Sequence, residues 1–179
     1  MASVDLENAG MLLSNAVADA VERAAAAVVT VRGRRRLPSS GVVFAQDLVL
    51  TASHTVERDE DIQVVLPDGS VLEAALAGRD PATDLALLRL SAQTGLSAAR
   101  PAGGHARVGS LVISVGRPAA GGPQASFGVV TALGAGLRTQ RGALLERYLV
   151  TDAVPLPGFS GGPLADLSGG LLGINTSGL

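Results

Sequence analysis

The sequence has no cysteine, no lysine, no tryptophan and very few aromatic residues. Without cysteine, the chain cannot use a thiol nucleophile, hold zinc through thiolates or form disulfides. Aromatic residues make up 2% of the chain, whereas hydrophobic residues make up 47%. The core must therefore be built from valine, leucine, isoleucine and alanine.

The sequence also lacks a strong charge bias and a long hydrophobic run. The formal net charge is −2, which gives no reason to expect nucleic-acid binding. Residues 1–10 contain Asp5 and Glu7 without a basic group, so no secretory signal is visible. The apolar run at 24–31 is too short to span a bilayer. We expect no membrane span and no nucleic-acid partner, and the localisation stays unknown.

Apolar periodicity predicts one helix followed by many short strands. Over residues 11–27, Leu13, Val17 and Val21 fall on one helical face. From Val28 onward, β-branched runs alternate with turn signals such as PDGS at 67–70. This pattern predicts an all-β sandwich or barrel after the helix. Eleven runs are predicted as strands: 27–31, 41–44, 48–53, 62–66, 71–76, 84–90, 110–116, 127–133, 148–152, 162–166 and 171–175.

The chain has only two histidines, which narrows the search for a general base. His54 follows the predicted strand 48–53, where the sheet would hold its side chain beside an open cleft. That position suits a general base. His105 lies in the glycine-rich loop PAGGHARVG and is predicted to be a surface residue.

Two aspartates precede or begin the apolar run LALLRL. Asp80 stands before Pro81, an arrangement typical of a turn. Asp84 lies at the mouth of a predicted buried strand, where a carboxylate is costly unless it has a partner. An imidazole N–H is such a partner and would fix the tautomer of the histidine. The alternative is a surface aspartate that caps the strand.

The stretch PGFSGGP places Ser160 among glycines. Residues 158–162 match G-x-S-x-G, the nucleophile elbow of α/β-hydrolases, but the acid and histidine of that fold must follow the serine. Here the order is His54, Asp84, Ser160, as in chymotrypsin-like β-barrel proteases. Glycine permits unusual backbone angles, so the N–H groups of Gly158 and Ser160 are candidates for an oxyanion hole.

Six segments resemble successive motifs of the HtrA (DegP-like) trypsin-fold serine proteases. They are LVLTASHTVE, DPATDLALLRL, VGSLVISVGRP, FGVVTAL, YLVTDAVPLPGFSGGPL and LLGINTSGL. The resemblance implies His54 as general base, Asp84 as the residue that orients it and Ser160 as nucleophile. It also implies that Gly158 and Ser160 form the oxyanion hole, and that no metal or organic cofactor takes part.

The resemblance further implies a chymotrypsin/trypsin-like double β-barrel with an N-terminal helix. Residues 1–27 would be a helical segment and residues 28–179 the protease domain. Residues 32–40, which contain the arginine run RGRRR, would form a regulatory loop; a plain solvated loop tip is the simpler interpretation. Residues 134–147 would form a ligand-sensing loop. Substrate backbone would pair along the segment Asn175, Thr176, Ser177 and Gly178.

The sequence departs from the family pattern in three ways. Phe159 stands before the serine, where relatives have a polar residue, asparagine in many of them. The chain stops at Leu179, whereas relatives continue with another strand and often a PDZ domain, so we expect an incomplete second barrel and a less stable fragment. Many bacterial relatives work in the cell envelope, although no export signal is visible here.

These features favour a serine endopeptidase that cleaves unfolded or extended polypeptides through an acyl-enzyme. The first alternative is a weakly active or inactive peptide-binding, chaperone-like module, which Phe159 and the incomplete pocket would favour. The second is an esterase or acyl transferase with the same three residues. A homo-oligomer is expected by resemblance, since relatives are commonly trimers built through N-terminal segments.

Overall fold

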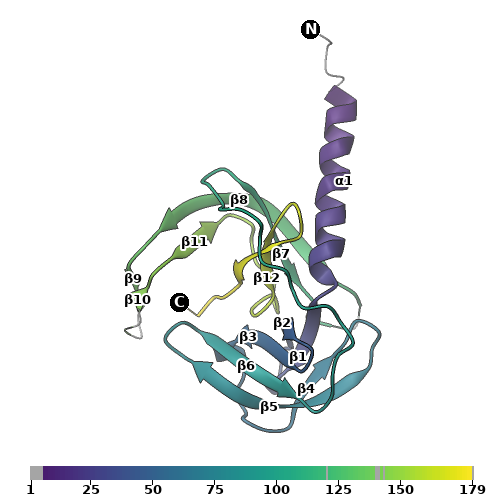
Figure 1. Ribbon diagram of the computed structural model, residues 1–179, viewed down its shortest axis with the longest axis vertical. Helices are drawn as coiled ribbons and strands as arrows, with labels where there is room; N and C mark the ends of the chain where they lie inside the picture. The colour runs from purple at the N-terminus through teal and green to yellow at the C-terminus, as the bar shows by residue number, and fades with distance from the viewer. Residues whose placement is uncertain (1–5, 120, 140–141, 143, 179) are drawn as a thin grey trace.

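A computed structural model of the chain describes residues 6–119, 121–139, 142 and 144–178. The first part of the fold is a closed barrel of six antiparallel strands, at the bottom of Figure 1. Around the barrel the strands follow the order β1-β2-β3-β6-β5-β4. Their bounds are β1 (Val28–Arg32), β2 (Ser39–Ala45), β3 (Leu48–Ala52), β4 (Ile62–Val65), β5 (Val71–Asp80) and β6 (Leu85–Leu90).

Aliphatic side chains fill this barrel, as the shortage of aromatic residues predicts. In β6 the alternate residues Ala86, Leu88 and Leu90 are buried, which is the period-2 pattern of a strand with one face toward a core. They meet Val29, Val31, Val43, Val49, Ile62 and Val64, all without exposed surface.

The second part of the fold is a five-stranded sheet that does not close within the described residues. Its order is β11-β8-β7-β12-β13, and Phe127, Leu133 and Val150 remain exposed on it. The predicted all-β double barrel with an incomplete second barrel is therefore confirmed. The strands are β7 (Leu111–Gly116), β8 (Gln124–Gly134), β11 (Tyr148–Thr151), β12 (Pro163–Asp166) and β13 (Leu171–Ile174), with the two-stranded hairpin β9 (Leu137–Arg138) and β10 (Leu144–Leu145) beside them.

All eleven predicted strands form, with boundaries shifted by a few residues. The PDGS hairpin also forms, between β4 and β5. Gly69 takes a φ of +87° there, and Asp68 accepts hydrogen bonds from the hydroxyl and the N–H of Ser70. These bonds favour the carboxylate and lower the pKa of Asp68.

The helix α1 (Leu6–Ala25) begins five residues before the predicted start at 11 and ends two residues before 27. It ends early because the chain turns into β1 at Val28. The second half of the helix packs into a core cluster in which Ala20 and Ala24 lie against Ile113.

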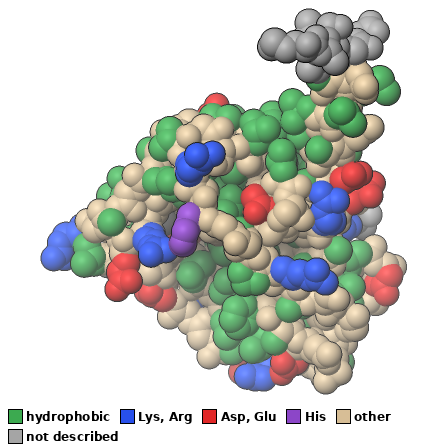
Figure 2. All heavy atoms as spheres, turned by 45° about the horizontal axis from the view of Figure 1, so that its top comes forward, with side chains coloured by type: hydrophobic (Ala, Val, Ile, Leu, Met, Phe, Trp, Pro, Cys, Tyr) green, Lys and Arg blue, Asp and Glu red, His purple; other side chains and the backbone are tan. Residues whose placement is uncertain are grey.

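The first half of α1 projects away from the body of the molecule, as Figure 1 shows. Its side chains Met11, Leu12 and Leu13 are exposed. Within the described residues, no helix has the length and hydrophobicity needed to cross a membrane. Figure 2 shows arginines and carboxylates scattered over one face of the molecule rather than gathered by sign.

Candidate active site

His54 lies directly after β3, as the sequence predicts. A short 3-10 turn, Ser53–Thr55, follows the strand and carries the histidine. The turn is held in place by three hydrogen bonds: Ser53 N–H donates to the Asp84 carbonyl at 2.9 Å, Thr55 Oγ1 donates to the Ala52 carbonyl at 2.7 Å, and Val56 N–H donates to the Ser53 carbonyl at 3.0 Å. The His54 side chain is 22% exposed. It therefore reaches solvent, while the hydrogen-bonded turn that carries it is held in place.

Asp84 lies in the turn before β6 and has no exposed surface. Its Oδ2 is 2.7 Å from Nδ1 of His54, and its Oδ1 accepts the backbone N–H of His54 at 2.9 Å. The predicted imidazole partner of this buried carboxylate is therefore present. Because the carboxylate is an acceptor, it favours the tautomer with the proton on Nδ1, which leaves Nε2 free to accept a proton.

The backbone of Asp84 adopts a φ of +57°, in the left-handed region. Aspartate and asparagine tolerate this region better than most residues. Asp80, four residues earlier, is the predicted turn residue: it accepts Ala82 N–H at 3.0 Å and Thr83 Oγ1 at 2.8 Å. These hydrogen bonds, with that from Thr83 the largest, lower the pKa of the exposed Asp80 carboxyl.

Thr176 adds a partner to Asp84 that the sequence analysis missed. Its hydroxyl donates to Oδ2 of Asp84, and Gly178 N–H donates to Thr176 Oγ1 at 3.0 Å. Gly178 also packs on the pair, because a Cβ there would lie 2.7 Å from Asp84 Oδ2 and 3.0 Å from His54 Nδ1. Only the glycine fits this close approach.

The loop that carries Ser160 is pressed against the first barrel. Gly158 and Gly161 both have a φ of +87°. A Cβ on Gly161 would overlap the Ser40 carbonyl and Thr51 Oγ1, and would lie 2.9 Å from Ala52 N. Since Ala52 ends the strand that leads to His54, Ser160 and His54 belong to neighbouring segments.

Ser160 itself is half-buried. Within the part of the chain that the structure describes, its hydroxyl makes no hydrogen bond to His54 or to another residue. The structure thus joins His54 to Asp84 and brings the serine loop beside them, but leaves the serine hydroxyl unbonded. Hydrogen bonds between catalytic groups are often long without substrate.

Three successive carbonyl groups of the serine loop, at residues 158–160, accept hydrogen bonds. Phe159 O accepts Gly162 N–H at 2.8 Å, while Gly158 O and Ser160 O both accept hydrogen bonds from Ser40. Phe159 N–H donates to Leu156 O at 3.0 Å. The N–H groups of Gly158 and Ser160 have no acceptor among the described residues, so two donors beside the serine are available to a ligand.

Phe159, the main departure from the family pattern in this loop, does not face the cleft. It has no exposed surface, and it heads the largest fully buried side chains of the described chain. Its ring lies on Gly116 at the end of β7, where a Cβ would come within 2.5 Å of the ring. The ring therefore anchors the serine loop in the core.

The four residues predicted to bind substrate have different surroundings. Asn175 is paired with the serine loop, since its carbonyl accepts Gly161 N–H at 2.8 Å and its N–H donates to Gly162 O at 2.9 Å. Thr176 contacts Asp84, as described above. Ser177 is exposed and Gly178 adjoins the His54–Asp84 pair. Pairing with a substrate backbone stays a prediction for this segment.

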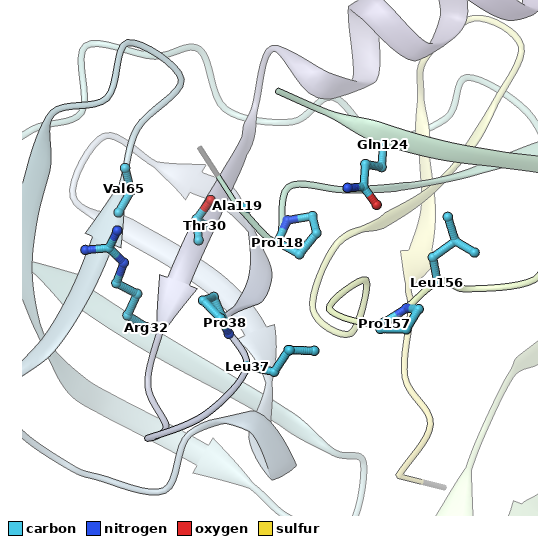
Figure 3. Close-up of a pocket in the computed structure, with 10 residues that line it drawn as sticks. All are labelled: Thr30, Arg32, Leu37, Pro38, Val65, Pro118, Ala119, Gln124, Leu156 and Pro157. Atoms are coloured by element: carbon cyan, nitrogen blue, oxygen red, sulfur yellow. The ribbon is translucent and has the colours of Figure 1, made fainter. Parts of the chain in front are cut away.

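A cavity of about 560 Å³ lies beside the serine loop (Figure 3). Leu37 and Pro38, from the predicted regulatory loop 32–40, form one wall, and Leu156 and Pro157 form another. Pro157 directly precedes Gly158, so the cavity adjoins the serine loop. The remaining lining residues are Thr30, Arg32, Val65, Pro118, Ala119 and Gln124.

Other predicted features lie away from this centre. His105 is exposed, as expected. The predicted sensing loop 134–147 contains the β9–β10 hairpin, and its residues 140, 141 and 143 lie outside the described residues. No three His, Asp or Glu side chains of the described chain gather in a way that could hold a metal ion.

Comparison with known proteins agrees with this geometry. The sequence profile of the trypsin-like peptidase domain matches residues 39–174. The periplasmic serine endoprotease DegP of Escherichia coli K12 is 37% identical over 142 residues, which cover 77% of this chain and 29% of DegP. A probable periplasmic serine protease do/HhoA-like of Haemophilus influenzae is 36% identical over 141 residues, covering 77% of this chain and 30% of its own length.

A solved structure shares the fold. The serine endoprotease from Yersinia pestis superimposes with a TM-score of 0.74 at 35% identity, covering 89% of this chain and 57% of that chain. The fold and the matched profile define a trypsin-like peptidase domain. Within that class, the chain belongs to the HtrA (DegP-like) family of serine proteases. It spans less than a third of the length of the curated relatives it matches.

Proposed function

We propose that the chain is the catalytic domain of a serine endopeptidase that cleaves unfolded or extended polypeptides. The buried Asp84 carboxylate, bonded to both the ring and the backbone of His54, carries this proposal. Burying a carboxylate is costly even when it is paired, and a buried carboxylate that holds a partly exposed histidine is the kind of pair that gathers at active sites. The two free N–H groups next to Ser160 add the second requirement of acyl transfer.

In the proposed reaction, Ser160 Oγ attacks the carbonyl carbon of a peptide bond while His54 Nε2 takes the hydroxyl proton. Asp84 stabilises the imidazolium that forms. The carbonyl oxygen becomes negative and is bound by the N–H groups of Gly158 and Ser160. The tetrahedral intermediate then collapses: the C–N bond breaks and His54 gives its proton to the leaving amine. Water, deprotonated by His54, hydrolyses the remaining ester and regenerates Ser160.

The expected result for Ser160→Ala is a fall in kcat of about 10⁴–10⁶ on an unfolded protein substrate such as reduced casein. Peptide products are counted by reaction of their new amino groups. Hydrolysis of a small ester by the same preparation separates a peptidase from an esterase, because an esterase would cleave the ester but not casein. Equal casein turnover by the parent chain and by Ser160→Ala would contradict the proposal.

A peptide-binding, chaperone-like module is the second candidate function. The Ser160 hydroxyl, which makes no hydrogen bond among the described residues, favours it. It predicts that the chain binds reduced casein without cutting it, and that Ser160→Ala binds equally well. Turnover that depends on Ser160 would exclude this candidate.

The homo-oligomer expected by resemblance would use α1, where Met11, Leu12 and Leu13 are exposed on the projecting half. Light scattering on the chain and on a variant with these three residues changed to serine tests this: we expect the mass of an oligomer for the first and of a monomer for the second.

A further inference from the structure

Ser40 has no role in the predicted catalytic set, yet it touches the oxyanion loop twice. It lies in β2 of the first barrel, without exposed surface. Its hydroxyl donates to the Gly158 carbonyl at 2.8 Å, and its backbone N–H donates to the Ser160 carbonyl at 3.1 Å. One residue of the first barrel therefore holds the carbonyl groups of both residues whose N–H groups are free.

The direction of the Ser40 hydroxyl is itself fixed. Arg117 N–H, at the end of β7, donates to Ser40 Oγ at 2.8 Å. A hydroxyl has one proton to donate, and with its oxygen engaged by Arg117 that proton goes to Gly158. The Arg117 guanidinium donates to the Val28 carbonyl at 2.9 Å, so Arg117 is held at a second point. Burial lowers the pKa of this guanidinium.

The oxyanion loop needs such an external support. Gly158 has a φ of +87°, and a Cβ there would overlap the Pro118 side chain, so no other residue can stiffen this position. Glycine leaves the peptide planes on either side free to rotate. Rotation of Gly158 would turn its N–H away from the site where negative charge develops. The Gly158 N–H lies in the peptide plane shared with Pro157, whereas the Gly158 carbonyl lies in the next plane, shared with Phe159. The Ser40 hydrogen bond fixes this second plane and the Cα of Gly158, so a turn of the N–H cannot be offset by a counter-rotation of the Phe159 side.

We propose that Ser40 is a positioning residue for the oxyanion hole: its hydroxyl and N–H hold Gly158 and Ser160 so that their N–H groups converge on the reacting carbonyl. This role rests on the proposed peptidase function. It acts through Gly158 and Ser160, and Ser40 itself touches neither the substrate nor the reacting atoms.

The test compares Ser40→Ala with Ser39→Ala. Ser39 is the adjacent residue, equally buried, and its hydroxyl donates to Thr55 Oγ1 at 3.0 Å rather than to the serine loop. Both variants lose a buried hydroxyl, so a purely structural effect would be similar in both. We expect Ser40→Ala to lower kcat for peptide hydrolysis by about 10–100-fold, less than the loss of a whole oxyanion donor, with KM within about twofold of the parent value.

Inhibition by a peptide aldehyde is a second measurement, and a change in the stability of the protein does not affect it. Ser160 adds to the aldehyde carbon, and the former carbonyl oxygen then lies at the N–H groups of Gly158 and Ser160. We expect the inhibition constant of the aldehyde to rise in Ser40→Ala by about the same factor by which kcat falls. Binding of the same peptide ending in an amide, which forms no such adduct, stays unchanged.

Ser40→Cys keeps a side chain of similar size with a weak donor, and covers the case in which Ser40→Ala does not fold. It is expected to fall between the parent chain and Ser40→Ala in kcat. Equal kcat and equal aldehyde inhibition in the Ser39 and Ser40 variants would overturn the role of Ser40 while leaving the peptidase intact. Absence of turnover in the parent chain would overturn the proposed function, and this role with it.

Discussion

Asp84→Asn is expected to lower kcat by about 10⁴-fold while the protein stays folded. The amide has one acceptor and one donor end, whereas both carboxylate oxygens of Asp84 accept hydrogen bonds from His54. If the NH₂ group faces the ring, it donates to Nδ1, the ring proton moves to Nε2, and His54 can no longer accept the proton of Ser160. The left-handed φ of residue 84 suits asparagine as well as aspartate, so the backbone is not strained.

The matched control is Asp80→Asn in the same turn. Asp80 also accepts two hydrogen bonds, but it is exposed and contacts neither His54 nor Ser160. Its kcat should stay within about twofold of the parent value, since surface substitutions away from special sites have small effects. Steady-state peptide hydrolysis gives kcat for both variants, and thermal melts of the same preparations show that each variant is folded. An Asp84→Asn protein with nearly full activity would rule out the orienting role of the carboxylate.

Phe159→Ala is expected to destabilise the chain by about 3–5 kcal/mol, the usual cost of emptying a fully buried aromatic site. The ring occupies the space left by Gly116 and has no exposed surface. Because Phe159 lies between the two residues with free N–H groups, loss of the ring should also lower kcat in the molecules that remain folded.

Urea denaturation measures this effect against Phe127→Ala. Phe127 lies on β8 with 45% of its surface exposed, so its truncation should cost under about 1 kcal/mol. Phe159→Leu, which keeps much of the apolar volume, should lie between the two alanine variants. Similar unfolding free energies for Phe159→Ala and Phe127→Ala would show that the ring does not anchor the loop.

The sequence predicts the strands of this fold well because most of them are short β-branched or leucine-rich runs bounded by clear turn residues. The hairpin at 67–70 is an example, since Gly69 takes the positive φ of the turn and the Asp68 side chain accepts the N–H of Ser70. The two-residue strands β9 and β10 were not predicted, because a pair of residues carries no periodicity. The end of the helix was predicted at residue 27, two residues too late. Alanines occupy this part of the sequence, and they suit both the helix and the strand that follows.

The pairing of Asp84 with His54 followed from the cost of burying a carboxylate. The contacts of Thr176 and Ser40 could not be found in that way. Each is a hydroxyl in or beside a strand, and its partner lies 92 or 118 residues away in the chain. A serine or threonine hydroxyl can stay at the surface without an energetic cost, and both residues are common in strands. The residue type therefore does not show which partner the hydroxyl bonds to. Only the folded arrangement of the two barrels brings these groups together.

The location of Phe159 likewise could not be predicted from the sequence, although its side chain is apolar. In the sequence, Phe159 stands out as a departure from the family pattern that would favour a weakly active or inactive module. The structure instead buries the ring against Gly116, a position at the end of β7 that nothing in the sequence links to the loop. The departure from the family pattern changes how the loop is anchored and leaves its free N–H groups in place.

If Ser160 is an activated nucleophile, it reacts covalently with a fluorophosphonate probe. The serine oxygen displaces fluoride from phosphorus, and the added mass is then located by peptide mapping. We expect a single label, on the peptide that contains PGFSGGP. The label should be absent in Ser160→Ala and form much more slowly in Asp84→Asn. No label on the parent chain, or a label that persists in Ser160→Ala, would contradict the role of Ser160 as nucleophile.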